Sequence, residues 1–513
     1  MKSLLIVLLA TVAVMASSRS MVVAEPSGVL DIGDRKQLFL DQSVVESASG
    51  VTFTMNTPSK RLEGPVLLPD APWEEAADGS IGLYCSVLRE NGKTRLWYDV
   101  RFGDTVQVAY AESTDGIHFE KPALGIFPLN GSMENNIVMP SRIGGCAVWI
   151  DPNASPEQRY RSQSKGYNEP TAQQLYSYTS HDGIHWTQWM HENIGDCDTQ
   201  SIAFWDRQVG RYVLYTRRNP NPGTPSRSRI IRRLESDDLT KWENETLVLQ
   251  ADAVDDATYA SPTPKPPVDY YGGAVFRYPD EEGLYLMLSQ PFWHFKRRPE
   301  GQRWGVKDVE NPKSGENLGP ATIDVRLNAS RDGIHFERVG GRRPFLAPGL
   351  SGAFDSKMVW AIPNPIPMGD EIWIYYAGTN KDHDGFVDPA AQGLLSGISV
   401  TTLRLDGFVS ADADYTGGEL TTRPLIFSGN RLELNMDAGG GGSVQVELLD
   451  EVGAPISGFS RAEATLLCGN SVRTPVSWGE GSDVASLAGR PVRLRFIMRD
   501  CRLYAFGFTD TAG

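Results

Sequence analysis

A short phrase recurs four times along this chain and constrains its fold more than any other feature. All four copies read Ser-x-Asp-x-x-x-aromatic, and three of them read Ser-x-Asp-Gly-Ile-His-aromatic; they begin at Ser113, Ser180, Ser236 and Ser330. Each copy follows a run with strand character. Asp-Gly is a turn signal, because Asp hydrogen-bonds the backbone locally and Gly accepts a positive φ. A repeated unit of roughly 40–90 residues built from short strands predicts a radial β-propeller.

The repeat predicts five blades, and the end of the chain predicts a second domain. A weaker fifth copy stands at Leu405-Asp406-Gly407-Phe408. Beyond it the phrase is missing, and segments such as 431–436 alternate apolar and polar residues, as strands buried on one face do. We therefore predict an all-β chain with a five-bladed β-propeller over residues 25–410 and a small β-sandwich over residues 411–513. Two further strands are predicted to lead into the first blade, at 38–41 and 51–55.

The first 24 residues have the features of a secretory signal peptide. Lys2 supplies a positive start, residues 4–14 an apolar core and residues 22–24 a small-residue cleavage site. No later segment is long and apolar enough to span a bilayer. We expect a secreted or periplasmic protein without a membrane span.

The net charge of −15 argues against a nucleic-acid partner, because a phosphate backbone demands clustered Lys and Arg. One arginine-rich stretch leaves a polyanionic glycan open as a partner, and the alternative is a solvated strand edge. Its members are Arg217, Arg218, Arg227, Arg229, Arg232 and Arg233.

Five cysteines cannot all pair within one chain, so at least one thiol is expected to be free. Cys85, Cys146 and Cys197 stand in or beside the first strands of three successive blades and match no zinc spacing, so we interpret them as core thiols. Cys468 and Cys501 share the C-terminal domain, and a disulfide between them stays open.

Motifs of cofactor and metal sites are missing from the sequence. It contains no Gly-rich phosphate loop, no Cys-x-x-Cys pair, no His-Glu-x-x-His and no Gly-x-Ser-x-Gly elbow. The histidines of the phrases repeat on outer turns, so we interpret His118, His185 and His335 as structural rather than as metal ligands. No cofactor and no metal site is predicted.

Together, the phrases, the five-blade count, the run Gly64-Pro65-Val66-Leu67 before the first blade and the appended sandwich resemble the five-bladed propeller glycoside hydrolases. These are the clans of invertases, levanases, arabinanases and β-xylosidases. The likeness extends from about residue 30 to the end and implies a secreted enzyme that hydrolyses glycosidic bonds. The sialidase Asp-box is a weaker match, because that motif has another residue between Asp and Gly.

The chain departs from this family at its chemistry. Invertase-type enzymes carry Trp-x-Asn-Asp-Pro-Asn for the nucleophile, Arg-Asp-Pro for a transition-state carboxylate and Glu-Cys for the acid. None of these three strings is intact here. The resemblance therefore implies the fold more than the mechanism, and whether the protein is catalytic stays open.

Glycoside cleavage needs two carboxyl groups that flank the scissile bond. In a propeller the first strands of all blades converge on the axis, so acids at or before their starts face a single funnel. We predict the essential carboxylates at Asp198 and Asp355, with Asp269 third and Asp78 fourth. Asp is depleted in strands, so strand propensity does not account for one acid per blade, although Asp also caps turns.

Polar and aromatic residues near these acids are predicted to bind the sugar. Aromatic rings offer faces on which sugar rings stack, and blade packing is the alternative for each tryptophan. The predicted substrate-binding residues are Trp73, Glu134, Asp196, Gln200, Tyr271, His294 and Trp360.

The leading functional hypothesis is a secreted glycoside hydrolase that acts on an oligo- or polysaccharide through a pair of carboxylates in the axial funnel. A noncatalytic carbohydrate-binding propeller is the alternative from another class. A glycoside phosphorylase on the same fold is a third hypothesis, and it would require a basic phosphate pocket that the sequence does not reveal.

Overall fold

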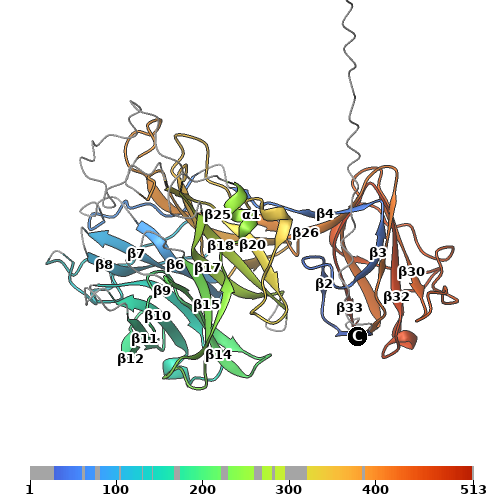
Figure 1. Ribbon diagram of the computed structural model, residues 1–513, viewed down its shortest axis with the longest axis horizontal. Helices are drawn as coiled ribbons and strands as arrows, with labels where there is room; N and C mark the ends of the chain where they lie inside the picture. The colour runs from blue at the N-terminus through green and yellow to red at the C-terminus, as the bar shows by residue number, and fades with distance from the viewer. Residues whose placement is uncertain are drawn as a thin grey trace, which may run out of the picture.

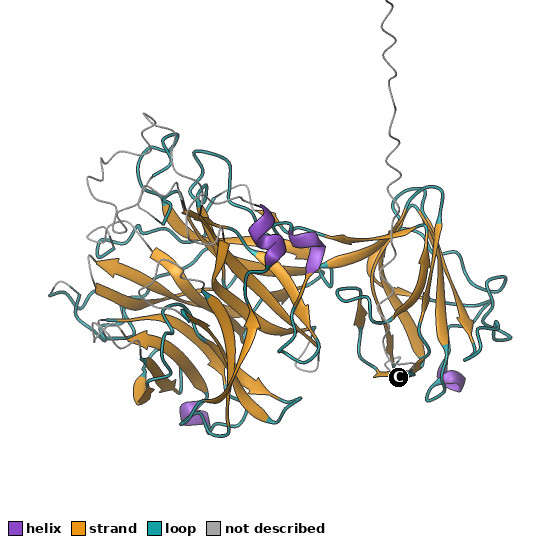
Figure 2. Cartoon of the chain, in the orientation of Figure 1, coloured by secondary structure: helices purple, strands orange, loops and turns teal. Residues whose placement is uncertain are grey.

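The computed structural model describes residues 28–510 apart from 61–63, 75–80, 103–104, 130, 141, 167–173, 221–228, 259–267, 280–282, 295–320 and 384–386. The described chain is nearly all β and forms two bodies, a ring of antiparallel sheets and a smaller pair of sheets (Figures 1 and 2). The predicted fold class, a β-propeller followed by a small β-sandwich, is confirmed. In the described ranges no helix has the length and apolar character needed to cross a membrane.

The ring consists, in the described part of the chain, of five successive antiparallel meanders, here called blades one to five. Blade one contains β6 (Ile81–Glu90), β7 (Lys93–Phe102) and β8 (Thr105–Ser113). Blade two contains β9 (Ile143–Ile150), β10 (Tyr160–Gly166), β11 (Leu175–Ser180) and β12 (Thr187–Glu192). Blade three contains β13 (Ile202–Asp206), β14 (Arg211–Arg218), β15 (Ile230–Ser236) and β16 (Glu243–Leu249).

The last two blades share one hydrogen-bonded sheet, because β19 (Ala321–Ile323) of blade four pairs with β22 of blade five. Blade four also contains β17 (Val268–Tyr278), β18 (Leu284–His294), β20 (Arg326–Ser330) and β21 (Glu337–Arg338). Blade five contains β22 (Met358–Ala361), β23 (Ile366–Met368), β24 (Glu371–Thr379) and β25 (Ser396–Arg404). The short helices are η1 (Pro156–Gln158), α1 (Ala253–Thr258), η2 (Val339–Arg342) and, in the sandwich, η3 (Ala485–Leu487).

The ring closes where the start of the propeller meets its end. Strand β5 (Ser59–Lys60), which precedes blade one in the sequence, pairs with β25 of blade five. In addition, the backbone N–H of Ile81 donates a hydrogen bond to Ser396 Oγ at 3.2 Å, which joins blade one to blade five. Closing the ring in this way packs blade one against blade five, so neither of these two blades leaves an apolar face uncovered.

The recurring phrase folds into a turn that its own aspartate holds together. Asp115 Oδ1 accepts the backbone N–H groups of Ile117 and His118 at 2.8 and 2.9 Å, and Asp115 Oδ2 contacts His118 Nδ1 at 2.7 Å. The same set of contacts forms around Asp182 and Asp332. Each phrase histidine therefore binds the aspartate of its own turn, which supports the structural interpretation of these histidines.

The turns also hold neighbouring blades together. The Trp97 indole Nε1 in blade one donates a hydrogen bond to the Gly183 carbonyl of blade two at 2.6 Å, and the Tyr215 hydroxyl in blade three donates to the Gly333 carbonyl of blade four at 2.8 Å. Gly183 has a φ of 77°, and a Cβ on it would lie 2.8 Å from the Trp97 ring. Glycine is needed there for both its conformation and its size. The repeated turn thus accepts hydrogen bonds that hold neighbouring blades together.

The sandwich consists of two sheets and takes strands from both ends of the chain. One sheet contains β31 (Asn470–Pro475), β29 (Arg431–Asp437), β33 (Cys501–Thr509), β26 (Val409–Ala413), β4 (Val51–Met55) and β2 (Gln37–Leu38). The other contains β3 (Val45–Ser49), β27 (Gly418–Thr422), β32 (Arg493–Arg499) and β30 (Ser443–Leu449). Beside them β1 (Leu30–Gly33) pairs in parallel with β28 (Leu425–Phe427).

The placement of the N-terminal strands differs from the sequence-based prediction. We expected residues 51–55 to lead into the first blade, but β4 pairs with β26, and β2 pairs with β33, so both strands belong to the sandwich (Figure 1). Packing explains the difference. Phe39 is fully buried, and its ring contacts Phe53 and Phe506 with centroids 6.0 and 6.3 Å apart. The sandwich core is thus completed by residues far upstream of the predicted boundary at residue 411.

All five cysteines lie in the described part of the chain, and none of them forms a disulfide there. Cys85, Cys146 and Cys197 are buried, as predicted for core thiols. Cys468 is exposed whereas Cys501 is buried in β33, so the disulfide that the sequence left open is not formed in this structure.

For three of the six arginines of the arginine-rich stretch, the alternative of a solvated strand edge is wrong. Arg217, Arg232 and Arg233 are only 1–2% exposed and each contacts a carboxylate. Arg233, for example, donates to Glu235 at 2.9 Å and to the Asp332 carbonyl of the next blade at 3.0 Å. These three buried guanidinium groups stabilise the interior of the propeller and do not form a surface patch.

Candidate active site

The meander geometry gathers charged side chains at one edge of the ring. In an antiparallel pair, the start of the first strand lies beside the end of the second. Asp198 precedes β13, and Asp269 lies at the start of β17, while Lys165 and Arg217 lie at the ends of β10 and β14. Residues from blades two, three and four thereby meet at the axial end of the propeller, and His383 of blade five joins them through Tyr271. We call this group the axial site; it comprises Lys165, Asp196, Asp198, Arg217, Arg229, Asp269, Tyr271 and His383.

Asp198 is held between two cations. Lys165 Nζ contacts Asp198 Oδ1, and Arg217 Nη2 donates to Asp198 Oδ2 at 2.5 Å. Burial opposes ionisation of Asp198, but the charges of Arg217 and Lys165 outweigh it and hold the pKa of this carboxyl below its ordinary value. The Asp198 side chain nevertheless remains 36% exposed, against 2% for Arg217. It is therefore an ionised carboxylate that a ligand can reach.

Asp196 shapes the loop that carries Asp198. Its Oδ1 accepts the backbone N–H of Asp198 at 3.2 Å, and its Oδ2 accepts the backbone N–H of Asn219 at 2.9 Å. Arg217 Nη2 lies 3.8 Å from Asp196 as well. We predicted a substrate-binding role for Asp196, and the structure places it at the axial site with the geometry of a loop-fixing residue.

A second ion pair lies beside the first. Arg229 Nη1 donates to Asp269 Oδ2 at 3.0 Å, and Asp269 is fully buried. The Tyr271 ring lies between the two arginines, with its centroid 5.4 Å from the Arg217 guanidinium carbon and 5.5 Å from that of Arg229. Tyr271 thus connects the Asp198 and Asp269 ion pairs into one continuous cluster.

Tyr271 also points toward blade five. Its hydroxyl lies 3.3 Å from His383 Nε2, and His383 packs against Phe292 with ring centroids 4.8 Å apart. His383 is exposed and was not among the predicted site residues. No sequence signal singled it out, because it stands outside the repeated phrases in a stretch without strand pattern.

Asp99 in β7 is a second carboxyl group that the sequence did not indicate. It is 1% exposed and accepts the backbone N–H of Gly145 at 3.0 Å. Burial raises the pKa of Asp99 to about 7, although Arg101, the Gly145 N–H and Lys165 act in the opposite direction. Lys165 therefore acts on Asp99 and Asp198 alike. Asp99 is buried, so it is out of reach of a ligand and acts on the axial site through the charge of Lys165.

Asp355, one of the two preferred catalytic candidates, lies in a different environment. It is 2% exposed and receives hydrogen bonds from Lys60 Nζ at 2.7 Å and from the Tyr376 hydroxyl at 3.0 Å. A Cβ on Gly378 would lie 2.5 Å from Asp355 Cβ, so this carboxylate is packed against β24. These contacts belong to blade five and the closing strand β5, and none of them is an axial-site residue.

Three of the predicted sugar-binding residues serve the packing of the blades. Trp73 Nε1 donates to Asn136 Oδ1 at 2.9 Å, and its ring packs against the core between blades five and one. Trp360 is 4% exposed within a cluster that includes Phe292. Gln200 Nε2 donates to the Cys85 and Cys146 carbonyls, both at 2.6 Å, and so ties blades one to three together near the axis.

The remaining predicted residues are either exposed or not described. Glu134 is exposed on the loop before β9 and contacts no residue of the axial site in the described part of the chain. Asp78 lies outside the described residues. The backbone of His294 ends β18, where it pairs with Ala321, and its side chain is not described.

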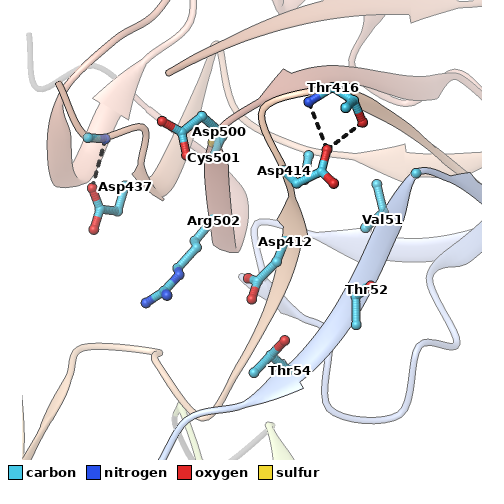
Figure 3. Close-up of a pocket in the computed structure, with 13 residues that line it drawn as sticks. Val51, Thr52, Thr54, Asp412, Asp414, Thr416, Asp437, Asp500, Cys501 and Arg502 are labelled. Atoms are coloured by element: carbon cyan, nitrogen blue, oxygen red, sulfur yellow. Dashed lines mark hydrogen bonds between the residues drawn. The ribbon is translucent and has the colours of Figure 1, made fainter. Parts of the chain in front are cut away.

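A hollow lies on the sandwich, lined by residues that do not belong to the axial site (Figure 3). Its volume is about 580 Å³. Four strands contribute a row of cross-strand neighbours to it, Thr52, Asp412, Arg502 and Asp437. Among the described residues, no group of three or more His, Cys, Asp or Glu side chains has the arrangement of a metal site.

No model of a known protein family matches this chain, and no curated protein is similar to it in sequence. Solved structures are similar to it in fold. An N-acetylgalactosamine deacetylase from F. plautii, in complex with blood group B trisaccharide, is 14% identical, with a TM-score of 0.44 over 70% of this chain and 97% of that chain. A β-1,2-mannobiose phosphorylase from Listeria innocua is 14% identical, with a TM-score of 0.41 over 68% and 96% of the two chains. A GH62 hydrolase in complex with xylotriose is 12% identical, with a TM-score of 0.39 over 71% and 99%.

Proposed function

We propose that this protein is a secreted glycoside hydrolase and that Asp198 is its reactive, ionised carboxylate. The observation that carries the proposal is the environment of Asp198, which combines exposure to a ligand with two cationic partners at the axial end of the ring. An ionised carboxylate of this kind suits the nucleophile or base of glycoside cleavage. The signal-like first 24 residues support export as part of the proposal.

Asp269 is assigned a positioning role in this proposal. It is fully buried and paired with Arg229, so it does not touch the substrate. By fixing Arg229 it holds the Tyr271 ring between two guanidinium groups. The Tyr271 hydroxyl, which meets exposed His383, is thereby held in position to bind a sugar hydroxyl group near Asp198.

The proton donor of the reaction is expected from blade one. Asp355 is enclosed by Lys60 and Tyr376, so of the four predicted acids Asp78 is the remaining candidate for the second carboxyl group. Glycosidases place two carboxyl groups about 5–5.5 Å apart for retention and about 6.5–9.5 Å apart for inversion. Mutation of Asp78 tests this assignment directly.

A noncatalytic carbohydrate-binding propeller is the second candidate function. One observation favours it: Asp269 and Asp355, two of the four predicted acids, are buried to 0–2% exposure and neutralised by cations. A binding protein needs only one accessible carboxylate to accept sugar hydroxyl groups. A phosphorylase is less well supported, because Lys165, Arg217 and Arg229 are each already paired with a carboxylate.

The test is an activity screen on sucrose and on levan, arabinan and xylan oligosaccharides, with and without inorganic phosphate. We expect phosphate-independent hydrolysis of at least one substrate by the wild-type chain. Asp198→Asn and Asp78→Asn should each lose about 10²–10⁴-fold in rate. Asp370→Asn is the matched control, because that aspartate is 72% exposed and outside the site. Binding without turnover in every sample would favour the noncatalytic function, and turnover only with phosphate would favour phosphorolysis.

A further inference from the structure

A second hollow opens on blade four, on the face of β17 and β18 that points away from the axial site. Successive residues of a strand point to opposite faces. The Phe292 ring centroid lies 5.0 Å from the guanidinium carbon of Arg229, so Phe292 is on the face toward the axial site. The next residue, Trp293, therefore points to the other face, where it lines this hollow. Its volume is about 360 Å³, within the range of about 300–1,000 Å³ usual for small-molecule sites. We call it the blade-four pocket, lined among others by Tyr270, Trp293, Asp324, Arg326, Asn328 and Arg338.

The lining of the blade-four pocket includes an ion pair of Asp324 and Arg326, here called the Asp324–Arg326 fork. Arg326 Nε and Nη2 donate to the two Asp324 oxygens at 2.7 and 2.6 Å, which is the bidentate geometry. The Arg326 guanidinium carbon also lies 5.2 Å from the centroid of the Trp293 ring. An aromatic ring and a fixed carboxylate–guanidinium pair therefore stand side by side, and each orients the other.

Another part of the lining is fixed by a second set of ion pairs. Arg342 Nη1 donates to Asp255 Oδ1 at 2.6 Å, and Arg338 Nη2 lies 3.3 Å from Asp255 Oδ2 and donates to the Gln250 carbonyl at 2.6 Å. Tyr270 packs beside them, with its ring centroid 5.9 Å from the Arg338 guanidinium carbon. Because each arginine of this pocket has a carboxylate partner, the pocket offers hydrogen-bonding groups in fixed positions without a free positive charge.

Asn328, which also lines the pocket, has a side-chain oxygen that accepts no hydrogen bond from the described residues. Asn328 is 1% exposed, and its Nδ2 donates to Ser289 Oγ at 2.8 Å and to the Met287 carbonyl at 3.2 Å. Its Oδ1 has no hydrogen-bond partner within the part of the chain that the structure describes. Buried acceptors are usually satisfied, so this atom favours a ligand or water that donates to it.

We propose that the blade-four pocket binds one sugar unit of a neutral glycan. A sugar ring presents an apolar face that packs on an aromatic ring, and hydroxyl groups that can bind the outer lone pairs of the Asp324 carboxylate and Nη1 of Arg326, which the Asp324–Arg326 ion pair does not use. Trp293, the Asp324–Arg326 fork and Asn328 provide these partners together. The pocket is separate from the axial site, so this inference holds whether or not the protein hydrolyses its ligand.

Calorimetric titration with the same oligosaccharides tests the proposal. The titrations use the Asp198→Asn protein, so that the ligand is not cleaved during the measurement. The wild-type protein is used as well for each oligosaccharide that it does not cleave. Trp293→Ala should weaken binding of at least one oligosaccharide about tenfold or more, and Arg326→Met, which removes the fork, should do the same. Trp293→Phe should retain most of the affinity, because it keeps an aromatic face.

Trp189→Ala is the matched control. Trp189 lies on blade two, is 37% exposed and likewise has an arginine over its ring, Arg161 at 5.3 Å. We expect no change in affinity from its removal. If both Trp293→Ala and Arg326→Met bind every oligosaccharide as tightly as Trp189→Ala does, or if no oligosaccharide of the panel binds at all, the blade-four proposal is overturned.

The two proposals fail separately. Loss of binding in Trp293→Ala without any turnover in the wild-type chain would support the blade-four pocket and contradict the hydrolase. Unchanged binding in Trp293→Ala, with turnover that depends on Asp198, would do the reverse. Thermal melting of each variant identifies a misfolded protein, and Arg326→Met then provides the readout in place of Trp293→Ala.

Discussion

Arg217 Nη2 lies 2.5 Å from Asp198 Oδ2, while Lys165 contacts the other oxygen of the same carboxylate. The guanidinium group is buried, but more than a third of the Asp198 side chain is exposed. The cations thus approach Asp198 from the protein side and leave its outer face to the solvent. This arrangement favours the ionised form of a carboxylate that a ligand can reach.

Removing the Arg217 charge should change the pH dependence of the reaction. The positive charges of Arg217 and Lys165 hold the pKa of Asp198 below its ordinary value, so Arg217→Met should raise that pKa. If turnover requires ionised Asp198, the acid limb of the pH–rate profile should move to higher pH in this variant. Arg218→Met is the control, because Arg218 is 45% exposed and pairs with Glu245 instead. An unchanged acid limb in Arg217→Met would separate Asp198 from the rate.

Asp99 should make the fold less stable as the pH rises. Burial raises the pKa of Asp99 to about 7 from 3.8, so between these values the folded protein binds a proton that the unfolded chain has released. Stability is therefore full below about pH 4, falls as the pH rises toward 7 and is constant above it. This difference between the unfolded and folded pKa values of Asp99 corresponds to a loss of roughly 4 kcal/mol in the free energy of unfolding.

The Asp99→Asn variant tests this effect. Asparagine keeps an oxygen for the Gly145 N–H but does not titrate, so the variant should gain stability relative to the wild type between pH 5 and pH 8. Melting temperatures of both proteins at the two pH values give the comparison. A difference that is the same at both pH values would show that Asp99 does not titrate in this range.

The buried Asp269–Arg229 pair should be costly to break on one side. Asp269→Leu leaves the Arg229 guanidinium, which is 12% exposed, without its carboxylate, and we expect a loss of about 3–5 kcal/mol in the free energy of unfolding. The double variant Asp269→Leu/Arg229→Met should recover most of this loss, because two apolar side chains replace the pair. Denaturant titration of the three proteins measures the coupling. Additive losses would mean that the two side chains do not depend on each other.

The sequence predicted the blades well because their turn chemistry is local. Asp115 and Gly116 stand within one short phrase, so the repeat alone indicates the turn that the structure shows. The same reasoning placed Asp198 just before the first strand of blade three, and in the structure Asp198 precedes β13.

Nonlocal contacts account for what the sequence did not predict. The partner of Asp269 stands 40 residues away and that of Asp355 stands 295 residues away, so no pattern near either aspartate indicates that it is buried and neutralised. Strand β4 alternates in the same way whichever sheet it joins, and only the pairing with β26 places it in the sandwich. Asp99 and His383 were missed for the same reason, because each acquires its role from a different blade.

The blade-to-blade contact at Gly183 should be sensitive to a single methyl group. Gly183→Ala combines a positive φ of 77° with a Cβ that would lie 2.8 Å from the Trp97 ring. Gly210→Ala is the matched control, since Gly210 has a φ of 67° but no atom within 4 Å of its Cβ position. We expect the positive φ to lower the free energy of unfolding by about 1–2 kcal/mol in both variants. The clash with Trp97 should lower it by about 1–3 kcal/mol more in Gly183→Ala. Equal melting temperatures for the two variants would contradict the docking role of the phrase.

The most direct test of the axial site is the kcat/KM of Asp198→Asn beside the wild type on the best oligosaccharide substrate, with thermal melting to confirm that the variant is folded. We predict measurable hydrolysis by the wild type and a fall of about 10²–10⁴-fold in the variant. A folded Asp198→Asn protein that retains wild-type kcat/KM would contradict the assignment of Asp198 as the reactive carboxylate.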